Sequence, residues 1–300
     1  MGKTQIIQYI TPEIISGDKP IWINPVGGMG DIIMLSTAML RSYERYGKKF
    51  NVARRSHYTS VFRNHPAVQE IGHPAEGSLL LCNDYWSRTE FADKNNRALF
   101  LLYKIFGVED EKREQLFFPE DKNVKESTQL ILDNVPWTSK TVVISCSSAS
   151  PRKMIHPSKW HNIVQKLLAQ QCFVVQVGTP NDIPIYGTYS LIGATRIMQM
   201  PKIIAKANLV ITLDNYIMHV AKLVEVPTIV LFGPTEQTRY GYSDHVCMQA
   251  DNSDCKDVDS CLGPHVPQNY ITPCPLCEIH CMNKFDEAKI VDVAMSILNT

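Results

Sequence analysis

Apolar positions along this chain alternate between two spacings. Short continuous apolar runs are typical of buried parallel strands, and each is followed by a stretch with apolar residues every three or four positions, as on one face of a helix. In the first half the pattern predicts strands at 21–23 and 50–53, and helices at 31–46, 98–106 and 122–132. A proline-containing stretch at 135–139 then reads as a linker.

The second half repeats the alternation. Its pattern predicts strands at 141–145, 172–177, 209–213 and 228–232, and helices at 160–168, 203–207, 216–224 and 290–298. Two such series predict two doubly wound α/β domains. We expect an N-terminal domain over 1–138, a second domain over 139–285 that includes a cysteine-rich segment at 251–283, and a C-terminal helix over 286–300.

The segment Asn24–Asp31, which reads NPVGGMGD, joins a strand to a helix. Gly28 and Gly30 let a ligand approach the backbone, and the helix N-terminus presents unpaired N–H groups to it. A carboxylate repels phosphate, so Asp31 is predicted to act on a neutral group, such as a hydroxyl whose proton it removes. The alternative is that Asp31 only caps the helix and complements its dipole.

Hydroxyl and basic side chains follow the predicted strand at 141–145. Ser147, Ser148, Arg152 and Lys153 form a candidate diphosphate site, since such groups bind phosphate oxygens. The alternative is a solvated basic loop.

Polar residues also follow the predicted strand at 209–213, namely Asp214, Asn215, Tyr216 and His219. Asn215 suits a helix N-cap, and a histidine in the first turn is expected to stay neutral. His219 is alternatively a packing residue. The turn at 232–235 ends at the same predicted sheet edge, where parallel sheets bind ligands.

Composition narrows the class of protein. The 300 residues suffice for two domains, and 44% of them are hydrophobic. Thirty basic residues balance thirty acidic ones, so no overall field favours nucleic acid or a membrane surface. No apolar run approaches the length of a transmembrane helix. Nine cysteines without a secretion signal indicate reduced thiols or metal ligands, and we expect a cytoplasmic protein.

Five cysteines crowd into a proline-rich stretch without helical or strand periodicity: Cys255, Cys261, Cys274, Cys277 and Cys281. Cys274 and Cys277 have the two-residue gap of a metal knuckle. Four of the five are predicted to hold a structural Zn²⁺ or mononuclear iron that takes no part in catalysis. The alternative is a loop of free thiols.

The order and spacing of the motifs at 24–31, 143–153, 214–221 and 230–235 resemble glycosyltransferase family 9, the bacterial heptosyltransferases. The resemblance spans about 21–298. It implies a GT-B fold, with two Rossmann-like domains facing a central cleft and the last helix crossing back to the first domain. It also implies an inverting sugar transfer from a nucleotide-diphosphate donor without a catalytic metal.

The resemblance assigns roles to individual residues. Asp31 matches the general base of the family, and Lys153 is the candidate for stabilising the departing diphosphate. Asp182 is a candidate ribose ligand by analogy with nucleotide-binding folds. The full donor-binding set is Gly28, Gly30, Ser147, Ser148, Arg152, Asp182, Asp214, Asn215, Tyr216 and His219.

One departure concerns the donor. The family usually has threonine or serine and then glycine after the aspartate, where this chain has Asn215 and Tyr216. The tyrosine adds bulk where backbone and diphosphate should meet. ADP-heptose is the favoured donor by resemblance, and another nucleotide sugar is the alternative.

Acceptor recognition is expected in the first domain. Arg54, Arg55 and His57 follow its second predicted strand and are candidates for holding an anionic acceptor, or else they form a solvated cationic loop. Acceptors in the family are saccharides of the lipopolysaccharide core or protein serines, and self-association stays open. Two other functions remain: a non-catalytic nucleotide-sugar-binding or assembly subunit, and a GT-B sugar epimerase.

Overall fold

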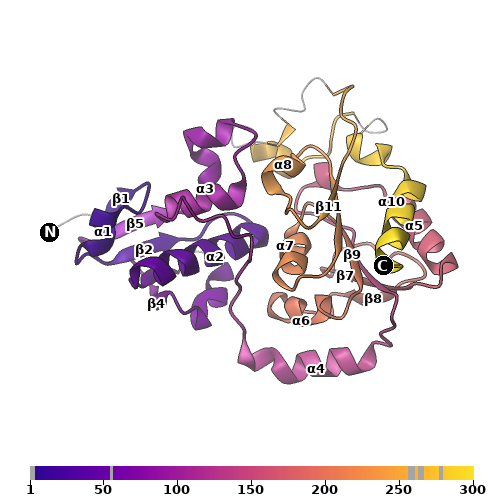
Figure 1. Ribbon diagram of the computed structural model, residues 1–300, viewed down its shortest axis with the longest axis horizontal. Coiled ribbons are helices and arrows are strands. Elements are labelled where there is room, and N and C mark those ends of the chain that lie inside the picture. The colour runs from indigo at the N-terminus through magenta and orange to yellow at the C-terminus, as the bar shows by residue number, and fades with distance from the viewer. Residues whose placement is uncertain (1–3, 55–56, 256–260, 263–266, 277–279) are drawn as a thin grey trace. The chain divides into compact units, whose positions relative to one another are not determined.

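The computed structural model describes residues 4–54, 57–255, 261–262, 267–276 and 280–300 (Figure 1). The chain divides into two compact units, Met1–Lys122 and Asn123–Thr300. Each unit contains one parallel β-sheet with helices, so the prediction of two parallel α/β domains is confirmed.

The sheet of the first unit has five strands, all parallel, in the order β1-β5-β2-β3-β4. Their bounds are Gln5–Ile7 (β1), Ile21–Asn24 (β2), Phe50–Ala53 (β3), Val68–Gly72 (β4) and Leu79–Cys82 (β5). The α-helices are Pro12–Ser16 (α1), Met29–Tyr46 (α2) and Ala98–Ile105 (α3). Helix α2 packs on α3 and ends where Gly47 takes a φ of +72°, a left-handed conformation that favours glycine.

Three strands of the first unit were not expected from the sequence. Strand β1 has only three residues, which is too short to show a period. Strand β4 lies at a sheet edge and has no buried residue. Strand β5 is three leucines and a cysteine, and this short apolar run suits a helix as well as a strand.

The second unit has six strands, all parallel, in the order β11-β10-β9-β6-β7-β8. Their bounds are Thr141–Ser145 (β6), Phe173–Gly178 (β7), Tyr189–Ile192 (β8), Leu209–Leu213 (β9), Thr228–Phe232 (β10) and Val246–Gln249 (β11). The α-helices are Lys125–Asn134 (α4), Pro157–Ala169 (α5), Met200–Ile204 (α6), Tyr216–Leu223 (α7), Gln237–Tyr240 (α8) and Glu287–Leu298 (α10). The sequence pattern missed β8 and β11, the two edge strands.

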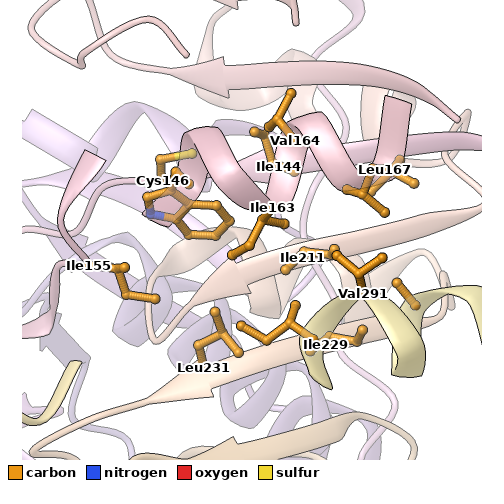
Figure 2. Close-up of a cluster of buried hydrophobic side chains, with 14 of the residues drawn as sticks. Ile144, Cys146, Ile155, Ile163, Val164, Leu167, Ile211, Ile229, Leu231 and Val291 are labelled. Atoms are coloured by element: carbon orange, nitrogen blue, oxygen red, sulfur yellow. The ribbon is translucent and has the colours of Figure 1, made fainter. Parts of the chain in front are cut away.

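The core of the second unit lies between its sheet and the pair α5 and α10. Ile144, Ile211 and Ile229 come from three neighbouring strands and share one sheet face, where Ile163 of α5 and Val291 of α10 pack on them (Figure 2). Figure 1 shows α6 and α7 on the other face of this sheet. Because both faces are covered, its central strands are continuous apolar runs rather than alternating ones.

Helix α4 belongs to the second unit, although the sequence placed the domain boundary after residue 138. Ser127 of α4 accepts a hydrogen bond from the amide of Gln199 at 3.0 Å. The carbonyl of Asn134 accepts one from the Tyr189 hydroxyl at 3.0 Å. These bonds tie α4 to β8 and to the residue that precedes α6. The boundary between the two units therefore falls before α4, after Lys122.

The last helix also packs within the second unit. Ile290, Val291 and Ala294 of α10 are buried, and they join the core against α5 and β9. The resemblance led us to expect that 286–300 crosses back to the first domain. In the structure the apolar face of this helix is instead buried on the second unit's own sheet.

Candidate active site

In the first unit, the turn after β2 is built around Asp31. Gly27 takes a φ of +97°, and a methyl group added there would lie 2.5 Å from Asp31 Oδ2. The Gly28 N–H donates to the same oxygen at 2.7 Å, so the carboxylate caps its own helix as well as facing the turn. Gly30 lies in the first turn of α2. Position 27 therefore requires glycine, because any side chain there would collide with the Asp31 carboxylate.

The other oxygen of Asp31 has a donor that the sequence did not indicate. The hydroxyl of Tyr85, which follows β5, donates to Asp31 Oδ1 at 2.6 Å. Tyr85 is 2% exposed. The predicted base, Asp31, is therefore a half-buried carboxylate whose orientation is held by hydrogen bonds to both of its oxygens.

The two units repeat one topological feature. In the first sheet, β2 lies between β5 and β3, and in the second, β6 lies between β9 and β7. The chain continues from β2 to β3 on one side and returns to the other side of β2 at β5, and it does the same around β6 with β7 and β9. Parallel α/β sheets bind ligands at the carboxyl ends of the two strands where the strand order reverses in this way. The Asp31 turn lies at this point in the first sheet. The predicted diphosphate residues lie at the equivalent point in the second.

Lys153, Asp214 and Thr235 meet at this edge of the second sheet. The Lys153 ammonium lies 3.2 Å from Asp214 Oδ2, and the Thr235 hydroxyl donates to the same oxygen at 2.6 Å. Asp214 is 7% exposed. The ion pair holds a cation beside hydroxyl groups, an arrangement that suits recognition of an anionic group.

The two predicted serines are held by neighbouring carboxyl and carbonyl groups. Ser147 donates to Asp182 Oδ2 at 2.5 Å, and Ser148 donates to the Asp214 carbonyl at 3.4 Å. Asp182 also accepts from the Thr179 N–H at 2.9 Å and from the Thr179 hydroxyl at 2.7 Å. The Asp182 carboxylate, predicted to bind ribose, therefore accepts hydrogen bonds from Thr179 in its own loop and from Ser147.

The side chain of Asn215 forms four hydrogen bonds within the protein. Its oxygen accepts from the Ile217 N–H at 2.9 Å and the Thr212 hydroxyl at 3.0 Å. Its amide donates to Ser145 Oγ at 3.0 Å and to the Ser147 carbonyl at 2.8 Å. Asn215 is therefore the N-cap of α7 and also ties β9 to β6, which accounts for asparagine where the family usually has threonine or serine.

Tyr216 begins α7. Burial raises the pKa of its hydroxyl above the usual value, so the side chain is neutral. The side chain is half-buried rather than projecting into solvent.

His219 lies one turn further along α7 and is 4% exposed. Its Nδ1 lies 2.6 Å from the Tyr242 hydroxyl. Burial lowers the pKa of His219 to about 4, and it lowers the pKa of His245, beyond Tyr242, to about 4 as well. His219 is thus a neutral ring packed inside the unit, and the cause is its burial rather than its place at the start of a helix.

Arg152 and Lys153 are neighbours on one short 3₁₀ turn, Pro151–Lys153, but they have different partners. The guanidinium of Arg152 donates to the Thr272 carbonyl at 3.2 Å and to Asn269 Oδ1 at 3.1 Å. It also donates to Cys261 Sγ at 3.7 Å. The sequence assigned Arg152 to the donor, whereas in the structure it holds the cysteine-rich segment.

Four of the five predicted metal ligands line one pocket of the second unit. The pocket lining includes Cys255, Cys261, Cys274 and Cys281, together with Arg152, Asp254, His280 and Lys284. Burial and the other cysteines raise the pKa of Cys281 to about 11 and also raise the pKa of Cys261, so these thiols lie within electrostatic reach of one another. Cys277 lies outside the described residues.

The cysteines within the described ranges are free thiols. No group of three or more histidine, cysteine, aspartate or glutamate side chains in those ranges is arranged to hold a metal ion. The donor atoms fit Zn²⁺ or iron in kind, because four thiols face one pocket. Their positions as described are not those of a coordination shell.

On the first unit, Arg54 lines a second pocket with Thr59, Arg63 and Ile71. Arg63 was not among the predicted residues. It lies on the 3₁₀ helix His57–Asn64 directly after β3. The predicted Arg55 and the side chain of His57 lie outside the described residues.

None of the helices in the described part of the chain combines the length and the hydropathy that crossing a bilayer requires.

Comparison with known proteins identifies the family. The model of glycosyltransferase family 9 (heptosyltransferase) matches residues 61–258. The match begins after the turn that carries Asp31, so it covers β4 to β11 and the Lys153–Asp214 cluster but not the predicted base. No curated protein matches the chain significantly.

Three solved structures share the fold. The family 9 glycosyltransferase from Veillonella parvula is 14% identical, with a TM-score of 0.69 over 94% of this chain and 97% of that one. ADP-heptose LPS heptosyltransferase II of E. coli is 14% identical, with a TM-score of 0.64 over 93% and 98%. The iron-containing dodecameric glycosyltransferase TibC of E. coli H10407 is 13% identical, with a TM-score of 0.69 over 100% and 77%. The predicted GT-B fold is thereby confirmed. The chain belongs to glycosyltransferase family 9, the heptosyltransferase family, and is a glycosyltransferase.

Proposed function

We propose that this glycosyltransferase moves heptose from ADP-heptose to an acceptor hydroxyl with inversion at the anomeric carbon. The observation that carries the proposal is the Asp31 carboxylate, held by the Gly28 N–H at 2.7 Å and the Tyr85 hydroxyl at 2.6 Å where β2 ends. A carboxylate held in one orientation can act as the general base that takes the proton of an incoming hydroxyl.

Asp31 and Lys153 account for the proton and the charge that the proposed reaction moves. The acceptor O–H bond breaks as its oxygen bonds to the anomeric carbon, and Asp31 takes the proton. The bond from the anomeric carbon to the diphosphate breaks, and its electron pair leaves with ADP. Lys153 stabilises the charge that develops on the diphosphate, and Asp214, which accepts a hydrogen bond from Thr235, holds the Lys153 ammonium in place.

The choice of donor is supported by relatives. Heptosyltransferase II is described as an ADP-heptose enzyme, and TibC has been solved with ADP-D-β-D-heptose. Both relatives share the fold at low sequence identity. The fold alone does not fix the donor, so ADP-heptose as the donor of this chain is itself proposed. We propose an anionic acceptor, a lipopolysaccharide core saccharide or a protein, because Arg54 and Arg63 line one pocket of the first unit.

A donor panel tests the proposal. Purified protein is incubated with ADP-heptose, UDP-sugars and GDP-sugars, with and without lipopolysaccharide core oligosaccharide or a serine-containing peptide. We expect ADP release from ADP-heptose that depends on the acceptor, and a product of inverted anomeric configuration by NMR. Binding without nucleotide release would indicate the non-catalytic subunit instead. An altered donor sugar in the absence of acceptor would indicate an epimerase.

We also propose that the cysteine-rich segment holds a structural iron or zinc ion. Four thiols line one pocket, and the TibC relative is described as iron-containing. Such an ion would cross-link a segment that has little apolar content of its own.

Elemental analysis is expected to find about one metal ion per chain. Cys274→Ser should lose it, and the control Cys247→Ser, in strand β11 outside the pocket, should keep it. We expect chelation to lower the melting temperature together with activity. Lost turnover with an unchanged melting curve would contradict a structural role.

A further inference from the structure

The turn that carries Asp31 is braced by the segment after β5. Strands β2 and β5 are neighbours, with Asn24 paired beside Cys82 at their carboxyl ends. The chain leaves both strands at the same edge of the sheet. The residues that follow β5, Asn83 to Tyr85, therefore meet the glycine turn that follows β2.

Asn83 fixes the backbone of this turn. Its side chain is fully buried. Its oxygen accepts from the Val26 N–H at 2.7 Å, and its amide donates to the Val26 carbonyl at 3.0 Å. The amide thus pairs with both polar groups of one residue, immediately before Gly27 takes its left-handed conformation. A buried amide with both groups bonded holds a backbone in one conformation.

Tyr85 fixes the carboxylate itself. Its ring is nearly perpendicular to that of Trp86 at a centroid distance of 5.0 Å and also contacts Phe91 at 5.9 Å, so the hydroxyl has little freedom. The hydroxyl donates to Asp31 Oδ1 at 2.6 Å while the Gly28 N–H holds Oδ2 at 2.7 Å. Because both oxygens accept from donors, rotation of the carboxylate would break these two charge-assisted hydrogen bonds.

We propose that Tyr85 is a positioning residue for catalysis: its hydroxyl aims the Asp31 carboxylate at the acceptor hydroxyl, with Asn83 holding the turn behind it. This inference rests on the proposed role of Asp31 as the base. Tyr85 keeps its own proton throughout, and the proton of the acceptor goes to Asp31. The hydroxyl acts only by holding the carboxylate in its reactive orientation, and loss of orientation by small displacements lowers turnover strongly.

A double-mutant cycle tests the inference. The variants are Tyr85→Phe, Asp31→Asn and the two together, with Tyr46→Phe as the matched control. Tyr46 lies in the same unit, and its hydroxyl also makes a 2.6 Å hydrogen bond, to the Gly107 carbonyl. Turnover is measured as ADP release from ADP-heptose with lipopolysaccharide core oligosaccharide, divided by the number of ADP-binding sites, so that unfolded protein does not contribute.

We expect Tyr85→Phe to lower kcat by about 10- to 100-fold, with the KM for ADP-heptose within about twofold of wild type. In the Asp31→Asn background, Tyr85→Phe should cause no further loss of kcat, because Tyr85 acts only through the Asp31 carboxylate. Wild-type kcat in Tyr85→Phe, or an equal loss with and without Asp31, would overturn the inference. Full turnover in Asp31→Asn would instead overturn the base itself, so the two failures are distinct.

Discussion

Asp31→Asn is expected to lower kcat by about 10²- to 10⁴-fold, the range typical of a lost general base. The amide has nearly the shape of the carboxylate. Its oxygen can still accept from the Gly28 N–H, and its NH₂ group can donate to the Tyr85 oxygen, so the turn should stay folded. What is lost is the ability to take a proton. The KM for the donor should therefore change little.

The measurement is acceptor-dependent ADP release under saturating ADP-heptose. Asp110→Asn is the matched control, because Asp110 is an exposed carboxylate of the same unit that pairs with Arg45. It should retain wild-type turnover. If Asp31→Asn retained wild-type kcat while folded, Asp31 would be a helix cap and no more.

Trp160→Ala is expected to cost about 3–5 kcal/mol of unfolding free energy. Trp160 lies on α5, is 1% exposed and belongs to the core shared with α10. Removing the indole leaves a cavity that close-packed strands cannot fill. At about 2–4 °C per kcal/mol for a domain of this size, the melting temperature should fall by roughly 10 °C.

Trp160→Phe is the graded comparison. Among the described residues the indole N–H has no hydrogen-bond partner, so phenylalanine gives up volume but no hydrogen bond. We expect it to lose less than half as much stability as alanine in urea unfolding followed by circular dichroism. Equal losses in the two variants would contradict a packing role for this side chain.

The elements that the sequence predicted well are those buried on both sides. Strands β9 and β10 were predicted with their observed bounds, since a β-branched apolar run between turn residues is unambiguous there. The edge strands β8 and β11 are only partly buried, and their patterns do not differ enough from a loop. Whether such an edge segment forms a strand depends on the strand it pairs with, which is distant in the sequence and leaves no mark on the local pattern.

The candidate site was predictable where a strand leads directly into it. Asp31, Lys153 and Asp214 all follow strands that the apolar pattern reveals. Tyr85 could not be found in this way, because β5 was not recognised and its place beside β2 depends on the order of strands in the sheet. The role of Arg152 was likewise hidden, since its partners lie more than a hundred residues further along the chain.

The neighbouring positions of Arg152 and Lys153 limit how the cysteine-rich segment can be redesigned. A chimera that replaced 255–281 with a shorter connection would remove the acceptors that hold the Arg152 guanidinium, namely Thr272, Asn269 and Cys261. The released cation would then stand without these partners one residue from Lys153, the cation that pairs with Asp214. Grafting that segment between homologues therefore requires a matched residue at position 152.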